Sequence, residues 1–390
     1  MDNIINEKNE RLVRYKQYTN IEFIQSLVKN DEYSLDEMQD GLMQKIKNNE
    51  FNRIVFTGMG CSAIVSNMIR GFFAEIKHPI QIHVINDYDF QLLLDNKILS
   101  DPQTLIIISS YSGHSKEPII AYYNCKQLNE NILFLTSGGK LAEIAKKDGI
   151  SIIRWKISNP DREYPLFHAP QYFVIILDFM AEMGILSSNY KQELKDTMEY
   201  LQNYVTPSLK RHASKIAEKL RNMDITLLAT PLWHGSLLKL VKMHLNEIAM
   251  APAHRNHFHE FCHSEVAVFS HPKQEHGVII FRDNNEDSYT ADKMNNLINL
   301  LSKDTSENKN IKVVVLDLDQ SDFFKKMFST LLFMHFVTYE LGLFYNTPSR
   351  ELISTAAGNP WYNQNTIIKE RKKKTNLVAK TINHSICFIA

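Results

Sequence analysis

The chain has 390 residues, enough for about two domains of ordinary size. Its 44 Lys and Arg residues balance its 44 Asp and Glu residues, and 44% of all residues are hydrophobic. This composition is typical of a globular protein, and the lack of a basic excess argues against a protein that binds nucleic acid or a membrane surface.

The N-terminus and the cysteines indicate a compartment. Residues 1–16 are polar and do not resemble a signal peptide. No apolar run approaches the roughly 20 residues of a membrane span. The cysteines have no paired spacing and stand at Cys61, Cys125, Cys262 and Cys387. We therefore expect a reduced, cytoplasmic protein.

Charged sequence with helical periodicity precedes the first strand. Residues 21–29 and 34–46 carry apolar side chains at helical spacing, and Ser34 or Asp36 suits the N-cap of the second helix. We expect an N-terminal helical segment over 1–34 and a first domain over 35–190.

From residue 53 apolar strands alternate with helices. The strands are expected at 53–57, 80–85, 104–109, 132–135 and 151–155, with helices at 62–76, 116–128 and 141–147. Continuous apolar strands separated by helices predict a parallel sheet that is covered on both faces.

A second alternation follows an apolar helix at 171–183 and a polar helical link at 187–222. Strands are expected at 225–229, 277–281 and 311–316, with helices at 236–248, 288–301 and 322–343. The chain therefore reads as two similar α/β domains, 35–190 and 191–360. Residues 361–390 form a basic tail, for which a solvated segment is favoured over a nucleic-acid arm.

Two serine-bearing loops, 57–62 and 109–115, each follow a strand and open a helix. Backbone N–H groups and the positive helix end make such a loop an anion site. Either loop alone could be a strand–helix turn with a serine cap. Two in one α/β unit favour a phosphate site, with the candidate ligands Gly60, Ser62, Ser110, Ser112 and Ser115.

Titratable side chains are densest between residues 244 and 265. Three interpretations stay open: a metal site, a solvated or partner-facing loop, and an acid/base pair of Glu247 and His263. The spacing of His254, His257, His259 and His263 matches no standard zinc pattern. Arg162, in an irregular stretch after the first sheet, is either an exposed loop residue or a fixed positive charge of the site. Cys61 begins a helix, where packing is favoured over a nucleophilic role.

At these residues the sequence resembles a known family. Residues 58–62 (Gly-Met-Gly-Cys-Ser) and 110–115 (Ser-Tyr-Ser-Gly-His-Ser) resemble the two loop motifs of sugar isomerase (SIS) domains in bifunctional phosphoglucose/phosphomannose isomerases. Residues 245–247 (Leu-Asn-Glu) and 260–265 (Glu-Phe-Cys-His-Ser-Glu) are similar to two further motifs of that family. Thr347-Pro348 falls where the family has Pro-Thr-Pro.

The resemblance implies two SIS domains with flavodoxin-like parallel sheets, and a homodimer with shared active sites. It implies that Ser62, Ser110, Ser112 and Ser115 hold the substrate phosphate. By the same resemblance Glu247 is the base, His263 assists ring opening from the other subunit and Arg162 stabilises an enediolate. Thr347 matches a pocket threonine.

The expected activity is aldose–ketose isomerisation of a hexose 6-phosphate through a cis-enediol, without a metal or organic cofactor. Glucose or mannose 6-phosphate would interconvert with fructose 6-phosphate. Cys61 and His114 depart from the family's glycine and asparagine. They keep two alternatives open: an isomerase of a modified or amino-sugar phosphate, and a non-catalytic phosphosugar-binding protein. We expect a phosphosugar as the partner, and neither nucleic acid nor membrane.

Overall fold

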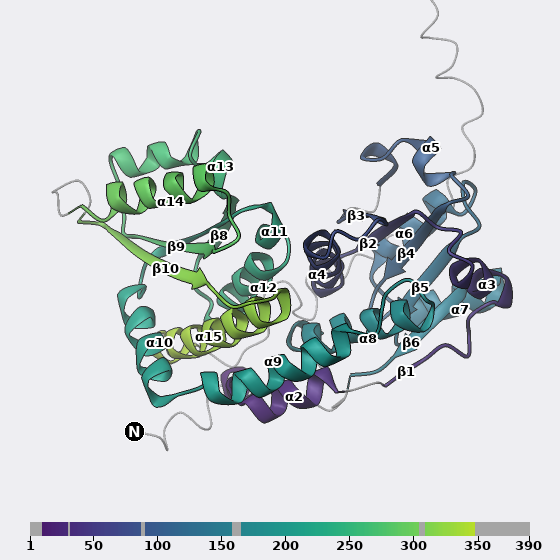
Figure 1. Ribbon diagram of the computed structural model, residues 1–390, viewed down its shortest axis with the longest axis horizontal. Helices are drawn as coiled ribbons and strands as arrows, with labels where there is room; N and C mark the ends of the chain where they lie inside the picture. Colours follow the sequence, from purple (N-terminus) through teal and green to yellow (C-terminus); the bar gives the residue numbers. More distant parts are fainter. Residues whose placement is uncertain (1–9, 30–31, 87–89, 158–164, 304–308, 348–390) are drawn as a thin grey trace, which may run out of the picture.

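Two sheets organise the chain, as the two runs of strand–helix alternation predict (Figure 1). The structure is a computed structural model that describes residues 10–29, 32–86, 90–157, 165–303 and 309–347. The expected basic tail at 361–390 lies outside the described residues. The α/β class with helix-flanked parallel sheets is confirmed.

The first sheet has the strand order β1-β6-β5-β4-β2-β3. Its strands are β1 (Tyr33–Ser34), β2 (Arg53–Gly58), β3 (Gln81–Ile85), β4 (Thr104–Ser109), β5 (Ile132–Thr136) and β6 (Ser151–Trp155). All pairs are parallel except β1 with β6. From β2 to β6 this is the flavodoxin-like order, whose ligand crevice lies between the first and third strands. Here those strands are β2 and β4.

Helices cover both faces of this sheet (Figure 1). They are α3 (Asp40–Lys47), α4 (Cys61–Glu75), η2 (Phe90–Leu92), α5 (Asn96–Leu99), α6 (Lys116–Cys125), α7 (Gly139–Asp148), η4 (Pro165–His168) and α8 (Ala169–Glu182). One correction concerns the helix expected from residue 34. Ser34 lies in β1, its Oγ accepts from the Asp36 N–H, and the helix begins at Asp40.

The second sheet repeats the pattern with four parallel strands in the order β10-β9-β7-β8. They are β7 (Asp224–Ala229), β8 (Ala253–His257), β9 (His276–Asp283) and β10 (Ile311–Leu318). Strand β8 was not expected. Its sequence, Ala-His-Arg-Asn-His, is polar because it forms a sheet edge and is only partly buried. A strand of this kind lacks the apolar run that identifies buried strands.

The remaining helices connect and flank the second sheet. They are α9 (Tyr190–Tyr204), α10 (Pro207–Lys219), α11 (Pro231–His234), α12 (Leu237–His244), α13 (Phe258–Phe261), η6 (Glu265–Ser270), α14 (Ser288–Leu301) and α15 (Phe323–Phe344). The helix expected over 236–248 does not stay regular. After α12 it widens into a π-helical turn, η5 (Leu245–Ala249).

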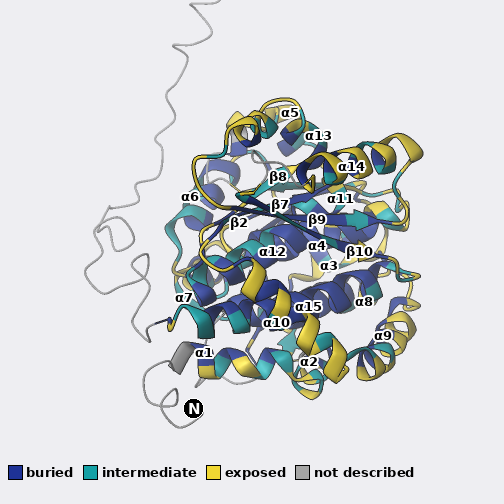
Figure 2. Cartoon of the chain, turned by 90° about the vertical axis from the view of Figure 1, so that its left-hand side faces the viewer, coloured by how far each residue is buried: buried dark blue, intermediate teal, exposed yellow. Residues whose placement is uncertain are grey.

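A hydrophobic core runs from the N-terminal helices α1 (Glu10–Tyr15), η1 (Lys16–Thr19) and α2 (Ile21–Val28) through both sheets. Helix α15 lies in its middle and is coloured as buried along most of its length (Figure 2). By length and composition α15 is apolar enough to cross a membrane, but 78% of its most apolar window is buried inside the chain. Most of α15 is thus buried against the rest of the chain.

Candidate active site

The two serine loops lie side by side at one edge of the first sheet. Strands β2 and β4 are parallel neighbours, and their register pairs Gly58 with Ser109 at the carboxyl end. The loops that follow therefore start from adjacent positions. This is the place where open parallel sheets bind ligands.

Glycines let the backbones of these loops approach closely. A Cβ on Gly58 would lie 2.9 Å from the Ser109 carbonyl oxygen. Gly113 has φ +66°, and a Cβ there would meet the Gly138 carbonyl oxygen at 1.9 Å. The loop after β4 thus packs directly on the loop after β5, and no larger residue fits at Gly113.

The candidate serines fall into two groups. Ser62 and Ser110 are buried, with 7% and 5% exposure. Ser112 is exposed, and its Oγ accepts from the His114 N–H at 3.3 Å. Ser115 is the half-buried N-cap of α6 and makes no side-chain cap bond. The second group thus offers hydroxyls that a bound anion can reach.

A buried tyrosine underlies the loops, and the sequence reasoning missed it. The Tyr172 hydroxyl is hydrogen-bonded to Ser109 Oγ and also to Ser62. Burial raises the pKa of Tyr172, so the phenol stays neutral. The Ser62 hydroxyl therefore already has a hydrogen-bond partner inside the protein. The sequence signal was a tyrosine in a mostly apolar helix.

Glu247 lies in the π-helical turn η5, a local widening that often occurs at functional sites. Leu245 before it is fully buried in the core. With its amide oriented to suit its neighbours, Asn246 donates to the carbonyls of Lys242 and Ala253, at 2.9 and 3.2 Å. In the Leu-Asn-Glu motif, Leu and Asn thus fix the turn, and Glu247 stays half-buried.

The Glu247 carboxylate acts electrostatically on Cys61 in the first serine loop, although 186 positions separate the two residues in the sequence. Burial, and then the Glu247 carboxylate, raises the pKa of the Cys61 thiol to about 12. At neutral pH Cys61 is therefore a thiol and not a nucleophilic thiolate. The Lys239 ammonium also acts on this thiol and lowers its pKa. The two halves of the chain thus meet at the N-terminus of α4.

His263 lies on the other side of the second sheet within this chain. Ile248 of η5 belongs to the core on the α15 face, whereas Phe261, two residues before His263, belongs to the core on the α14 face. The His263 side chain is exposed. One chain therefore does not bring Glu247 and His263 together.

The other histidines of the segment 244–265 each contact a different residue. His254 lies 3.3 Å from Asp224, the His257 ring contacts the His234 ring at a tilt, and His259 stacks on Tyr289. Within the described ranges no group of three His, Cys, Asp or Glu side chains is arranged to hold a metal ion.

Two further candidates remain. Thr347 is buried, and its hydroxyl donates to the Gly342 carbonyl at 2.9 Å and to the Ala249 carbonyl at 3.5 Å. It therefore ties the end of α15 to the turn that carries Glu247. Arg162 falls in residues 158–164, outside the described residues.

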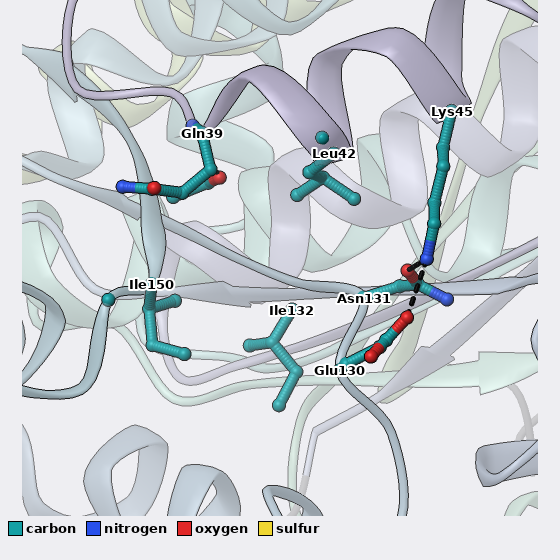
Figure 3. A pocket seen from close by; sticks show the side chains of 10 residues that line it. Gln39, Leu42, Lys45, Glu130, Asn131, Ile132 and Ile150 are labelled. Carbon is teal, nitrogen blue, oxygen red and sulfur yellow. Dashed lines mark hydrogen bonds and ion pairs between the residues drawn. The ribbon is translucent and has the colours of Figure 1, made fainter.

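A shallow pocket at the opposite edge of the first sheet is a weaker candidate (Figure 3). It lies between α3 and the starts of β5 and β6. Lys45 Nζ donates to Glu130 at 2.6 Å and to Asn131 at 3.0 Å. Its one lysine is already neutralised, and it faces the amino ends of the strands.

Comparisons with known proteins point to the phosphosugar isomerases. Residues 209–351 match the family described as bacterial phospho-glucose isomerase C-terminal SIS domain. A bifunctional phosphoglucose/phosphomannose isomerase of Caldicellulosiruptor bescii is 28% identical over 251 residues, which cover 61% of this chain and 68% of the relative. The resemblance drawn from the motifs is confirmed.

A second relative and two solved structures extend this picture. A D-glucosamine-6-phosphate 4-epimerase of Sulfolobus acidocaldarius is 24% identical over 56% of this chain and 64% of its own length. The C-terminal domain of a glucosamine-fructose-6-phosphate aminotransferase from Francisella tularensis superposes with a TM-score of 0.60 at 13% identity, covering 89% of this chain and 99% of the other. A glucosamine-6-phosphate deaminase from Thermotoga maritima gives 0.57 at 14% identity, covering 87% and 96%. At such identities the structures establish the fold alone.

Proposed function

We propose that this chain, whose residues 209–351 match the bacterial phospho-glucose isomerase C-terminal SIS domain, is an aldose–ketose isomerase of a hexose 6-phosphate. It would interconvert glucose or mannose 6-phosphate with fructose 6-phosphate. The observation that carries the proposal is the electrostatic proximity of Glu247 to Cys61 in the first serine loop. A base and an anion-binding loop from different halves of the chain thus converge.

The proposed chemistry needs few groups. The loops after β2 and β4 hold the phosphate through backbone N–H groups and the hydroxyls of Ser112 and Ser115, with Ser62 and Ser110 beneath them. This fixes the far end of the sugar. Glu247 then moves a proton between C1 and C2 through a cis-enediol, a transfer worth about 10²–10⁴ in rate. Arg162 is assigned to the enediolate oxygen, and Thr347 to the pocket wall.

We further propose a cytoplasmic homodimer. The opposite placement of Glu247 and His263 in one chain supports it, because His263 can assist ring opening only at the site of a second copy. The division into an N-terminal segment to residue 34 and two SIS domains, 35–190 and 191–360, is part of the same proposal. The family match from residue 209 supports the second domain.

A second candidate is an enzyme acting on an amino-sugar phosphate. The similarity to a D-glucosamine-6-phosphate 4-epimerase favours it, as does the exposed His114 ring at the rim of the second loop. It would use the same phosphate loops with a different C2 substituent.

The test is product formation from fructose 6-phosphate by wild type, Glu247→Gln and the control Glu275→Gln, which removes an exposed carboxylate on the loop before β9. We expect glucose or mannose 6-phosphate from wild type and the control, and at least about a hundredfold less from Glu247→Gln. Stabilisation of Glu247→Gln by fructose 6-phosphate should persist. Binding without turnover in wild type would establish a phosphosugar-binding protein, and full activity of Glu247→Gln would refute the assigned base.

A further inference from the structure

A group of basic side chains lies where α4 of the first sheet contacts α11 and α12 of the second. Figure 1 shows these helices between the two sheets. The group, called the basic cluster below, comprises Arg70 on α4, His234 on α11, Lys239 on α12, and Arg255 and His257 on β8. Arg255 and His257 belong to the dense titratable segment 244–265, whereas Arg70, His234 and Lys239 lie outside the sequence motifs discussed above.

The centre of the basic cluster is a stack around His234. The His257 ring lies 3.6 Å from the His234 ring, centroid to centroid, at an interplanar angle of 34°. Nη1 of Arg255 lies 2.8 and 2.9 Å from the two ring nitrogens of His234. The same atom donates to the His234 carbonyl at 2.9 Å. The guanidinium of Arg255 is thereby held in place.

Arg70 reaches this stack from the other half of the chain. A Cβ on Gly235 would lie 3.1 Å from Nη2 of Arg70 and 2.7 Å from Oδ1 of Asn67. The guanidinium therefore lies directly against the turn between α11 and α12. Arg70 and His257 are exposed, so solvent and small ligands reach the basic cluster.

These cations have no counter-charge among the described residues. Elsewhere in the chain arginines and lysines pair, as Arg53 does with Asp101 and Arg282 with Asp317. No described carboxylate lies within ion-pair distance of Arg70, Lys239 or Arg255. Among the described carboxylates, Glu260 acts electrostatically on His257, and its effect is smaller than those of Arg255 and Arg70.

The basic side chains also disfavour one another's charge. Burial, followed by Arg255 and Lys242, lowers the pKa of Lys239 to about 8. Burial, followed by Arg255 and His257, lowers the pKa of His234 to about 3, so that its imidazole is neutral at pH 7. Partly desolvated cations without an anion destabilise the fold, and arrangements of this kind are typical of binding sites.

We propose that the basic cluster binds a phosphate group, at a second anion site distinct from the serine loops. Three cationic groups, the guanidinium groups of Arg70 and Arg255 and the Lys239 ammonium, can balance a dianion. A ligand with a single carboxylate would leave an excess of positive charge. Arginine forks match the oxygens of phosphate, and the exposed His257 imidazole can add a hydrogen bond. Lys239 interacts electrostatically with both Arg255 and Cys61, so the basic cluster extends toward the first serine loop.

The test is calorimetric titration of the full-length protein with inorganic phosphate at low ionic strength. Arg70→Gln and Arg255→Gln remove cations of the basic cluster, Arg211→Gln removes an exposed charge on α10, and a Ser112→Ala/Ser115→Ala variant weakens the loop site. We expect the loop variant and Arg211→Gln to retain phosphate binding at the basic cluster. Arg70→Gln, which alters an exposed side chain and is not expected to impair folding, should weaken it about tenfold.

The phosphate group can belong to either of two ligands, which fructose 1,6-bisphosphate distinguishes. If Arg70→Gln weakens binding of the bisphosphate and not of fructose 6-phosphate, one sugar bisphosphate spans both sites. If inorganic phosphate and fructose 6-phosphate bind together without competition, the cluster holds a separate ligand. Phosphate binding that is equal in wild type, Arg70→Gln and Arg255→Gln, or weakened equally by Arg211→Gln, would overturn the proposal.

Discussion

Strands β4 and β9 occupy equivalent places in the two sheets, and each ends in a buried polar residue. Ser109 ends β4 and bonds to the neutral Tyr172 hydroxyl on α8. Asp283 ends β9, accepts from Trp233 Nε1 at 2.6 Å, and pairs with Lys326 Nζ on α15 at 2.5 Å. One end is therefore built from neutral hydroxyls and the other from a buried ion pair.

The difference explains why the end of β4, and not the equivalent end of β9, is the candidate phosphate site. At the second sheet Thr230 donates to Glu286 at 2.6 Å, so acidic side chains already take up the donors there. Buried carboxylates repel an anion. The first end presents hydroxyls, glycines and helix N-termini without carboxylates in its motifs. Equal topology thus does not imply an equal site.

The largest expected effect comes from breaking the ion pair of the second sheet. Lys326→Met leaves Asp283 buried without its cation, which typically costs about 3–5 kcal/mol of unfolding free energy. The neighbour Lys325→Met is the control, because its pair with Asp322 at 2.8 Å is partly exposed. We expect the control to lose under about 1 kcal/mol in chemical denaturation. Equal losses would show that the ion pair at β9 is no more important than a surface pair.

A buried histidine pair that lies away from both sheet ends is expected to make the stability of the fold depend on pH. His244 and His335 stack at 4.9 Å, and Tyr15 Oη bonds to Nδ1 of His244 at 2.8 Å. Burial lowers the pKa of His335 from 6.5 to about 4. Below pH 6.5 the unfolded chain binds a proton that the folded chain rejects, so stability is present above pH 6.5 and falls toward pH 4.

His335→Gln should therefore reduce the slope of unfolding free energy against pH in this window. The expected reduction is up to about 1.4 kcal/mol per pH unit, the value for one proton. The exposed His271→Gln serves as the control and should leave the slope unchanged. Denaturation curves between pH 4 and 6.5, the two pKa values involved, provide the measurement. An unaltered slope in His335→Gln would argue against a depressed pKa.

The smallest expected effect comes from the neutral sheet end. Tyr172→Phe removes the hydroxyl beneath Ser109 and Ser62 and should cost about 1 kcal/mol, the net value of a neutral hydrogen bond. Phosphosugar affinity should stay within a few-fold of wild type, because the proposed site holds the phosphate mainly through backbone N–H groups. If Tyr172→Phe lost as much unfolding free energy as Lys326→Met, the neutral end of β4 would be as important for stability as the ion pair at the end of β9, contrary to the account.

Most of the fold follows from the sequence, because buried parallel strands are continuous apolar runs. β2, β4 and β9 were expected to within two residues at either end. The polar edge strand β8 was missed, since partial burial allows histidine and arginine at its positions. The start of α3 was wrong, because Ser34 forms a turn bond that resembles a helix cap.

The candidate site is less accessible to sequence reasoning. Glycine and serine spacing locates the two loops, since their geometry depends on local residues such as Gly113. The contribution of Tyr172 depends on how α8 packs across the sheet, and that packing has no local signature. The proximity of Glu247 to Cys61, and the separation of Glu247 from His263, are likewise properties of tertiary structure.

The most direct test of the account is deuterium exchange at C1 of fructose 6-phosphate in heavy water, followed by NMR. If Glu247 faces the loop-bound sugar, wild type should incorporate deuterium, and Glu247→Gln should do so at least about a hundredfold more slowly. Incorporation by Glu247→Gln at the wild-type rate would contradict the placement of the base at this site.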